Sequence, residues 1–162
     1  MTDLVPLLQE FHREKVSALL QHQAGARLVG QYDVNNTYQY IVNREDAQRS
    51  WVATAILELG GTIPAEPDEP TRPAVGKAAD AMRAIIEEDA RAAQAFVDRW
   101  RPRIDAMTNA RHAKMLRVIL GEVLEQKRFF DQALAGRTDL LGRRGECLGP
   151  SHGEVLASRW IE

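Results

Sequence analysis

Glu45 and Gln48 occupy positions in an apolar helical pattern where a bundle ordinarily has Leu or Ile. At about 100° per residue, one narrow sector of the segment 38–59 contains Tyr38, Ile41, Glu45, Gln48, Val52, Ala55, Ile56 and Leu59. A carboxylate buried without a partner is costly, so Glu45 needs a cation, a metal ion or a proton. The chemistry of the chain therefore depends on which groups lie opposite this position.

Four segments have the period of an amphipathic helix, and no segment alternates as a strand does. They cover about residues 3–29, 35–59, 74–100 and 109–135. Gly60 and Gly61 end the second helix, and Pro102 kinks or ends the third. The pattern predicts an all-α four-helix bundle in residues 1–135.

The second and third helices are joined by residues 62–73, in which every third residue from position 64 is proline. This period is typical of polyproline II, whose rise of about 3.1 Å per residue allows the segment to span about 40 Å. A helix of about 25 residues has the same length, so the third helix can run parallel to the second. The rival interpretation is a PxxP ligand for an SH3-like partner, but Arg72 is its only basic anchor.

Acidic residues lie near the middle of the second and third helices, in Glu45-Asp46-Ala47-Gln48 and in Ile86-Glu87-Glu88-Asp89-Ala90-Arg91. With two helix pairs and a long crossover, this layout resembles the ferritin-like superfamily of bacterioferritins and rubrerythrins over about residues 3–135. In that family each half supplies one Glu and one Glu-x-x-His to a pair of iron or manganese ions. The last motif falls at 122–125 or 125–128, and neither stretch contains a histidine.

The chain departs from the family because lysines stand near the expected ligands. Folding the first helix back across the link 30–36 places Lys15 roughly opposite Glu45. A similar estimate brings Lys127 close to Asp89. An ammonium group repels a divalent ion and offers no lone pair. We therefore predict a non-catalytic or vestigial bundle in which Lys15–Glu45 and Asp89–Lys127 pairs replace the metals, with Gln48 and Gln126 completing the hydrogen bonds.

Two other interpretations stay open. In the first, the lysine stems reach outward and the carboxylates hold two Fe or Mn ions, which implies an O₂- or peroxide-dependent oxidase or an iron-handling protein. Its metal ligands are Glu14, Glu45, Gln48, Glu87 or Asp89, Glu122 and His12. In the second, the inward polar groups are interhelical hydrogen bonds of a structural or interaction bundle. No nucleophile or phosphate loop accompanies them, so we assign no catalytic residue and, in the first choice, no cofactor.

Composition indicates one globular domain, with 162 residues, 44% hydrophobic and 27% charged. A net charge of −2 argues against a nucleic-acid surface. No leader pattern and no stretch of about 18 apolar residues is present, so we expect a cytoplasmic protein without a membrane partner. The single cysteine, Cys147, excludes an internal disulfide and a Cys-rich metal site.

We expect the turn-rich residues 136–162 to form a separate C-terminal tail. Trp160 and Ile161 are too apolar for a solvated end, so we expect the tail to dock on the bundle or on a neighbouring subunit. Trp51 falls about 100° from the centre of the buried stripe of the second helix. An exposed Trp is typical of an interface, and we predict a homodimer.

Overall fold

The computed structural model describes residues 3–73, 76–137 and 139–142, and within these ranges every regular element is a helix. The elements are α1 (Leu4–Ala26), α2 (Tyr32–Glu58), α3 (Ala78–Asp105) and α4 (Ala110–Leu134). The prediction of an all-α bundle of four helices is confirmed. Cys147, Trp160 and Ile161, to which other predictions apply, lie outside the described residues.

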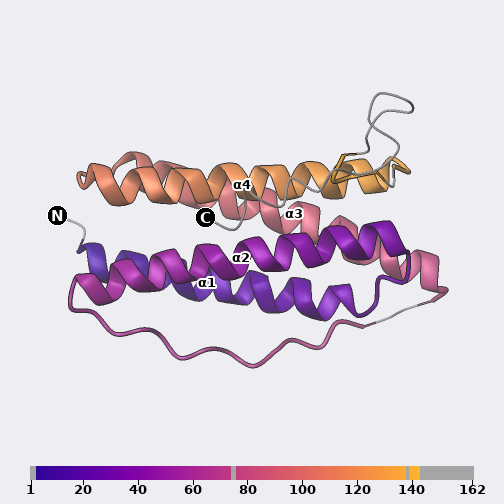
Figure 1. The fold of residues 1–162 in the computed structure, drawn as a ribbon, viewed down its shortest axis with the longest axis horizontal. Helices are drawn as coiled ribbons and strands as arrows, with labels where there is room; N and C mark the ends of the chain where they lie inside the picture. The colour runs from indigo at the N-terminus through magenta and orange to yellow at the C-terminus, as the bar shows by residue number, and fades with distance from the viewer. Residues whose placement is uncertain (1–2, 74–75, 138, 143–162) are drawn as a thin grey trace, which may run out of the picture.

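The helices form two hairpins, with α1 packed on α2 and α3 packed on α4 (Figure 1). The hairpins meet where α2 contacts α4. The segment between α2 and α3, here named the connection (residues 59–77), carries no helix in its described part and runs along the length of the bundle. Because it returns the chain to the end where α2 begins, α3 runs in the same direction as α2.

Local signals explain where most helices begin and end. The Gln31 side chain accepts a hydrogen bond from Val34 N at 2.6 Å, and Asn109 accepts one from His112 N at 3.1 Å. Both bonds satisfy backbone donors that a helix start leaves unpaired. Gly60 has a φ of 77°, the left-handed conformation that terminates helices and favours glycine. It ends α2 where the sequence predicts.

Pro102 does not end α3, since the helix continues to Asp105. The predicted end of the third helix at about residue 100 was therefore wrong. A proline removes the hydrogen bond to the carbonyl four residues earlier and crowds that carbonyl, which here belongs to Asp98. Both residues are exposed, so water can hydrate the freed oxygen. Beyond the proline, Ile104 is fully buried and anchors the last turn on the core.

The apolar core is divided into two clusters, one toward each end of the bundle. One contains Leu8, Phe11, Ile56, Trp100 and Leu116 among others, and the second contains Tyr38, Ile41, Ile86, Phe129 and Phe130 among others. Lys15, Glu45, Gln48 and Gln126 fall between the residues of the two clusters along their helices, and Asp89 lies next to Ala90 of the second cluster. A charged layer therefore crosses the middle of the interior, where the ferritin-like resemblance expects metal ligands.

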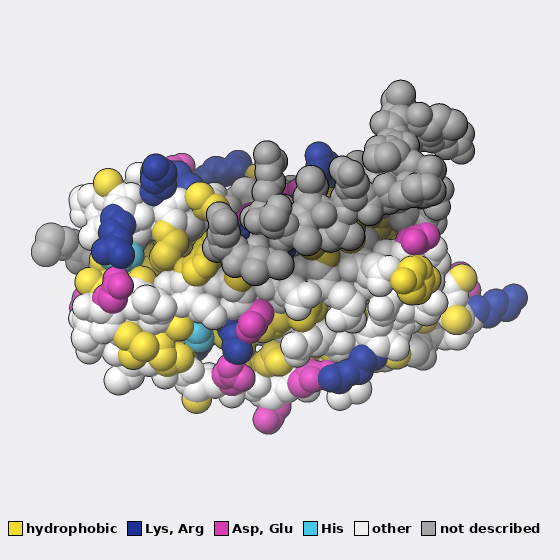
Figure 2. All heavy atoms as spheres, in the orientation of Figure 1, with side chains coloured by type: hydrophobic (Ala, Val, Ile, Leu, Met, Phe, Trp, Pro, Cys, Tyr) yellow, Lys and Arg dark blue, Asp and Glu magenta, His cyan; other side chains and the backbone are white. Residues whose placement is uncertain are grey.

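The surface mixes charges of both signs, and Figure 2 shows Lys and Arg side chains next to Asp and Glu side chains on the face drawn. Trp51 is 38% exposed, with the Arg44 guanidinium 5.7 Å from its ring centroid. Its predicted exposure is confirmed, whereas Leu59, which was expected inside, is 41% exposed. Within the described part of the chain, no helix is long and apolar enough to cross a membrane.

Candidate functional site

The middle of the bundle is occupied by a set of buried polar side chains, here named the polar layer. Its members are Lys15, His22, Tyr38, Glu45, Gln48, Arg72, Asp89 and Gln126. They come from all four helices and, in the case of Arg72, from the connection. Each of them is nine-tenths or more buried, so their charges must be balanced inside the protein rather than by water.

Glu45 is held between two nitrogen donors from α1. Lys15 Nζ lies 3.0 Å from Glu45 Oε1, and His22 Nδ1 lies 2.7 Å from Oε2. Burial by itself would raise the pKa of Glu45, but the charges and hydrogen bonds of His22 and Lys15 outweigh it and lower the pKa to about 2. The predicted Lys15–Glu45 pair is confirmed, and His22 is a partner that sequence analysis missed.

Burial and the Glu45 carboxylate act in opposite directions on the charge of His22. Burial disfavours the imidazolium, but the Glu45 carboxylate outweighs it and raises the pKa of His22 above 6.5. When His22 is protonated, two positive groups face the single negative charge of Glu45. The sequence held a signal for this, because His22 lies seven residues after Lys15 and therefore on the same face of α1.

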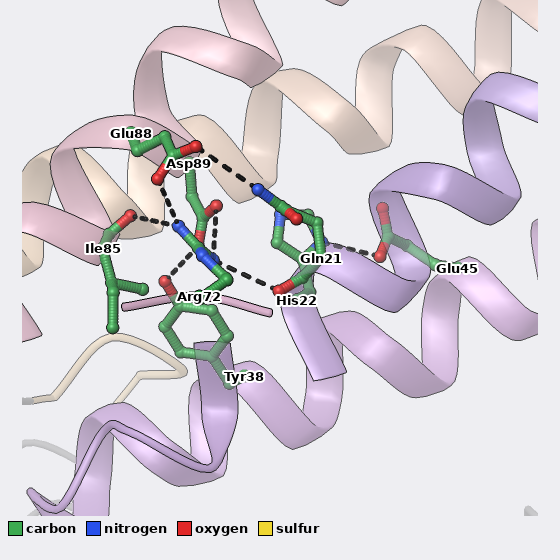
Figure 3. Close-up of polar contacts among 8 residues, drawn as sticks. All are labelled: Gln21, His22, Tyr38, Glu45, Arg72, Ile85, Glu88 and Asp89. Atoms are coloured by element: carbon green, nitrogen blue, oxygen red, sulfur yellow. Dashed lines mark hydrogen bonds and ion pairs between the residues drawn. The ribbon is translucent and has the colours of Figure 1, made fainter. Parts of the chain in front are cut away.

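Asp89 on α3 is neutralised by Arg72 of the connection, as Figure 3 shows. Arg72 Nη1 lies 3.0 Å from Asp89 Oδ2 and 2.9 Å from Oδ1. The Tyr38 hydroxyl donates to the same carboxylate at 2.5 Å, and burial, followed by the Asp89 charge, raises the pKa of Tyr38 well above 10. The phenol therefore remains a donor throughout the physiological pH range.

The predicted Asp89–Lys127 pair was wrong. Lys127 Nζ instead lies 2.6 Å from Asp131 Oδ2, one turn further along α4, and its side chain is 28% exposed. A surface pair at this spacing keeps the ammonium group hydrated, whereas a pair with Asp89 requires its full burial. Arg72 already occupies that place.

Arg72 makes further contacts that join the two hairpins. Its guanidinium donates to Gln21 O at 3.2 Å, to Ile85 O at 3.2 Å and to Glu88 Oε2 at 3.1 Å (Figure 3). Burial opposes the charge of Arg72, but the hydrogen bond and charge of Asp89 outweigh it and raise its pKa. Gly25 leaves room for this group, because a Cβ there would lie 2.5 Å from Arg72 Nη1.

The two glutamines of the polar layer do not complete the hydrogen bonds of the ion pairs as expected. Gln48 Nε2 donates to Glu122, while its Oε1 has no partner among the described residues. Gln126 Nε2 likewise has no partner in this part of the chain, although the residue is only 3% exposed. Gln126 Nε2 is therefore an unused donor of the layer, and Arg72 Nε is another among the described residues.

The carboxylates considered as metal ligands do not converge. Glu14 pairs with Arg99 and accepts from Trp100 Nε1 at 2.9 Å, and Glu122 pairs with Arg44. His12, the possible nitrogen ligand, is buried, and burial lowers its pKa.

No group of three or more His, Cys, Asp or Glu residues suited to a metal ion is present in the described ranges. The donor set of the proposed dimetal centre, Glu14, Glu45, Gln48, Asp89 and Glu122, is thus divided among separate pairs, and these described residues do not fit that centre.

No protein-family model matches this chain, and no curated protein or solved structure matches it. Its class is consequently given by its own architecture, an all-α four-helix bundle with a charged layer between two apolar clusters.

Proposed function

We propose that this protein is a non-catalytic, vestigial ferritin-like bundle in which Lys15 and Arg72 take the place of a pair of metal ions. The observation that carries the proposal is the pairing of each interior acid with a cation of the same chain. Glu45 contacts Lys15 at 3.0 Å, and Asp89 contacts Arg72 at 2.9 Å. The dimetal oxidase named above is the competing function.

Electrostatics supports this reading over the competing one. A divalent ion at Glu45 would lie beside a lysine ammonium group, which repels it and cannot coordinate it. Moving Lys15 away would also expose a group that is 1% accessible and rests over the Phe96 ring, 5.6 Å from its centroid. The same holds at Asp89, where Arg72 is fixed by four hydrogen-bond acceptors.

A role without metal chemistry gives the polar layer a structural meaning. Replacing a buried ion pair by apolar residues is often neutral for stability, so the presence of such a pair is weak evidence that it serves to stabilise the fold. We propose that the pairs fix the register of α1 on α2 and of the connection on α3. Nothing in this role requires a substrate.

Two measurements on protein purified without chelator test the proposal. The first is elemental analysis, and the second is an assay of Fe(II) oxidation by O₂. We expect substoichiometric metal and an oxidation rate equal to that of buffer. About two metal ions per chain, lost together in Glu45→Ala but retained in the exposed control Glu58→Ala, would overturn the proposal in favour of the oxidase.

A further inference from the structure

A cavity of about 400 Å³ adjoins the polar layer. It lies between α1 and α3, beneath Pro67 and Pro70 of the connection, and reaches Glu45 of α2 and Gln126 of α4 at its inner end. Small-molecule sites have volumes of about 300–1,000 Å³. The cavity is therefore of a size that holds one compact organic molecule.

The walls and the inner end of this cavity differ in chemistry. Phe96, Ala93 and Val123 contribute apolar surface, and all three are buried parts of the core. Lys15 and Gln126 line the same cavity and supply hydrogen-bond donors. An apolar wall with a few convergent polar groups is the usual composition of a ligand pocket.

Both donors have unused capacity. Lys15 Nζ has three N–H groups and makes one hydrogen bond, to Glu45. Gln126 Nε2 is buried and has no partner within the described part of the chain. A buried donor without an acceptor costs about 1–3 kcal/mol, so an acceptor atom entering the cavity would relieve this cost.

We infer that the cavity binds a small monocarboxylate with a compact apolar body, whose carboxylate accepts hydrogen bonds from Lys15 and Gln126 while its body packs on Phe96 and Val123.

The surrounding charges favour one negative charge and not two. Lys15 and His22 both contact Glu45, whereas Arg72 and Asp89 balance each other. The cavity is also lined by Asp68 and by Glu14, which pairs with Arg99 of the same lining. These carboxylates would repel a phosphate dianion more strongly than a monoanion, so the lining favours a single carboxylate over a phosphate.

Titration with benzoate tests the inference. Binding is monitored by ligand-observed NMR and by calorimetry, both in the presence of EDTA. We expect saturable binding of one benzoate per chain, and weaker binding of both benzamide and phenyl phosphate. Gln126→Leu, which removes the unpaired donor without altering charge, should weaken benzoate binding about tenfold. Ala93→Leu should abolish it by filling the cavity, with circular dichroism showing that both variants fold.

The matched control is Gln132→Leu, which changes an amide on the same helix α4 but outside the lining, and should bind benzoate as the unmodified protein does. No saturable binding up to about 10 mM, or equal binding by all three variants, would overturn the site. Benzamide or phenyl phosphate binding as tightly as benzoate would overturn the carboxylate assignment. Metal content measured on a chelator-free portion of the same preparation separates this result from the proposed function, which can fail while benzoate still binds.

Discussion

Substituting Arg72 by Met should destabilise the bundle more than any substitution of a surface arginine. The side chain of Arg72 is 2% exposed, and that of Asp89 is fully buried. Met keeps much of the apolar stem but removes the guanidinium. Asp89 then retains the Tyr38 hydroxyl as a donor and loses its counter-charge. An uncompensated carboxylate would remain in the core.

The expected magnitude follows from the loss of one partner of a buried pair, which costs about 3–5 kcal/mol. The carbonyls of Gln21 and Ile85 lie within helices and keep their backbone partners, so they add little. The free energy of unfolding of a natural domain is about 5–15 kcal/mol, so Arg72→Met should remove a large fraction of it. At about 2–4 °C per kcal/mol, the melting temperature should fall by about 6–20 °C.

Urea unfolding followed by circular dichroism measures this change, and the urea m-value shows whether the transition stays comparable. The control Arg27→Met removes an exposed arginine that pairs with Glu69 of the connection, and should cost less than about 1 kcal/mol. The double variant Arg72→Met/Asp89→Leu should recover much of the loss, because it removes both charges. A midpoint for Arg72→Met within error of the control, or a double variant no better than the single one, would refute this reasoning.

Three further predictions concern other parts of the chain. Glu45, with its pKa lowered from 4.5 to about 2, contributes stability above pH 4.5 that is lost as the pH falls toward 2. His22, with its pKa raised above 6.5, contributes stability below pH 6.5 that is lost as the pH rises through its folded-state pKa. The urea midpoint should therefore be highest between about pH 4.5 and pH 6.5. A His22→Gln variant that keeps the same pH maximum would contradict the role given to His22. Gly25→Ala should lower the melting temperature because its Cβ meets Arg72, whereas Gly121→Ala, with open space around it, should raise it slightly; equal shifts would argue against the contact. We predict that the unmodified chain sediments as a dimer and Trp51→Glu as a monomer, and unchanged association would remove Trp51 from the proposed interface.

The parts of the fold that follow from local rules were predictable. Helical period and glycine terminators located the four helices to within a few residues, because these signals act within a turn or two of the residue that carries them. The Lys15–Glu45 pair was also within reach, since a short link between antiparallel helices fixes which residues face each other. The extent of α3 past Pro102 was not, because it depends on the burial of Ile104.

The partner of Asp89 was beyond such rules. Arg72 lies in a segment without helical period, so its position depends on the path of the whole connection across α1 and α3. Lys127 suited a helical-wheel argument, but it has an acidic neighbour four residues away that the same sequence displays. Lys127 pairs with Asp131 because a surface pair needs no desolvation, whereas a pair with the distant, buried Asp89 would require it.

The path of the connection also explains why the cavity and the polar layer lie together. The backbones of α1 and α2, of α3 and α4, and of α2 and α4 lie close together, whereas α1 meets α3 through side chains, among them Phe11 with Trp100 and Glu10 with Arg103. Arg72 adds a further link between α1 and α3 by bonding Gln21 and Ile85, while Pro67 and Pro70 line the cavity beside it. Larger apolar residues in the place of Arg72 would leave Asp89 without its counter-charge. The cavity and the buried charges therefore lie together because the connection passes beside both α1 and α3 at this level.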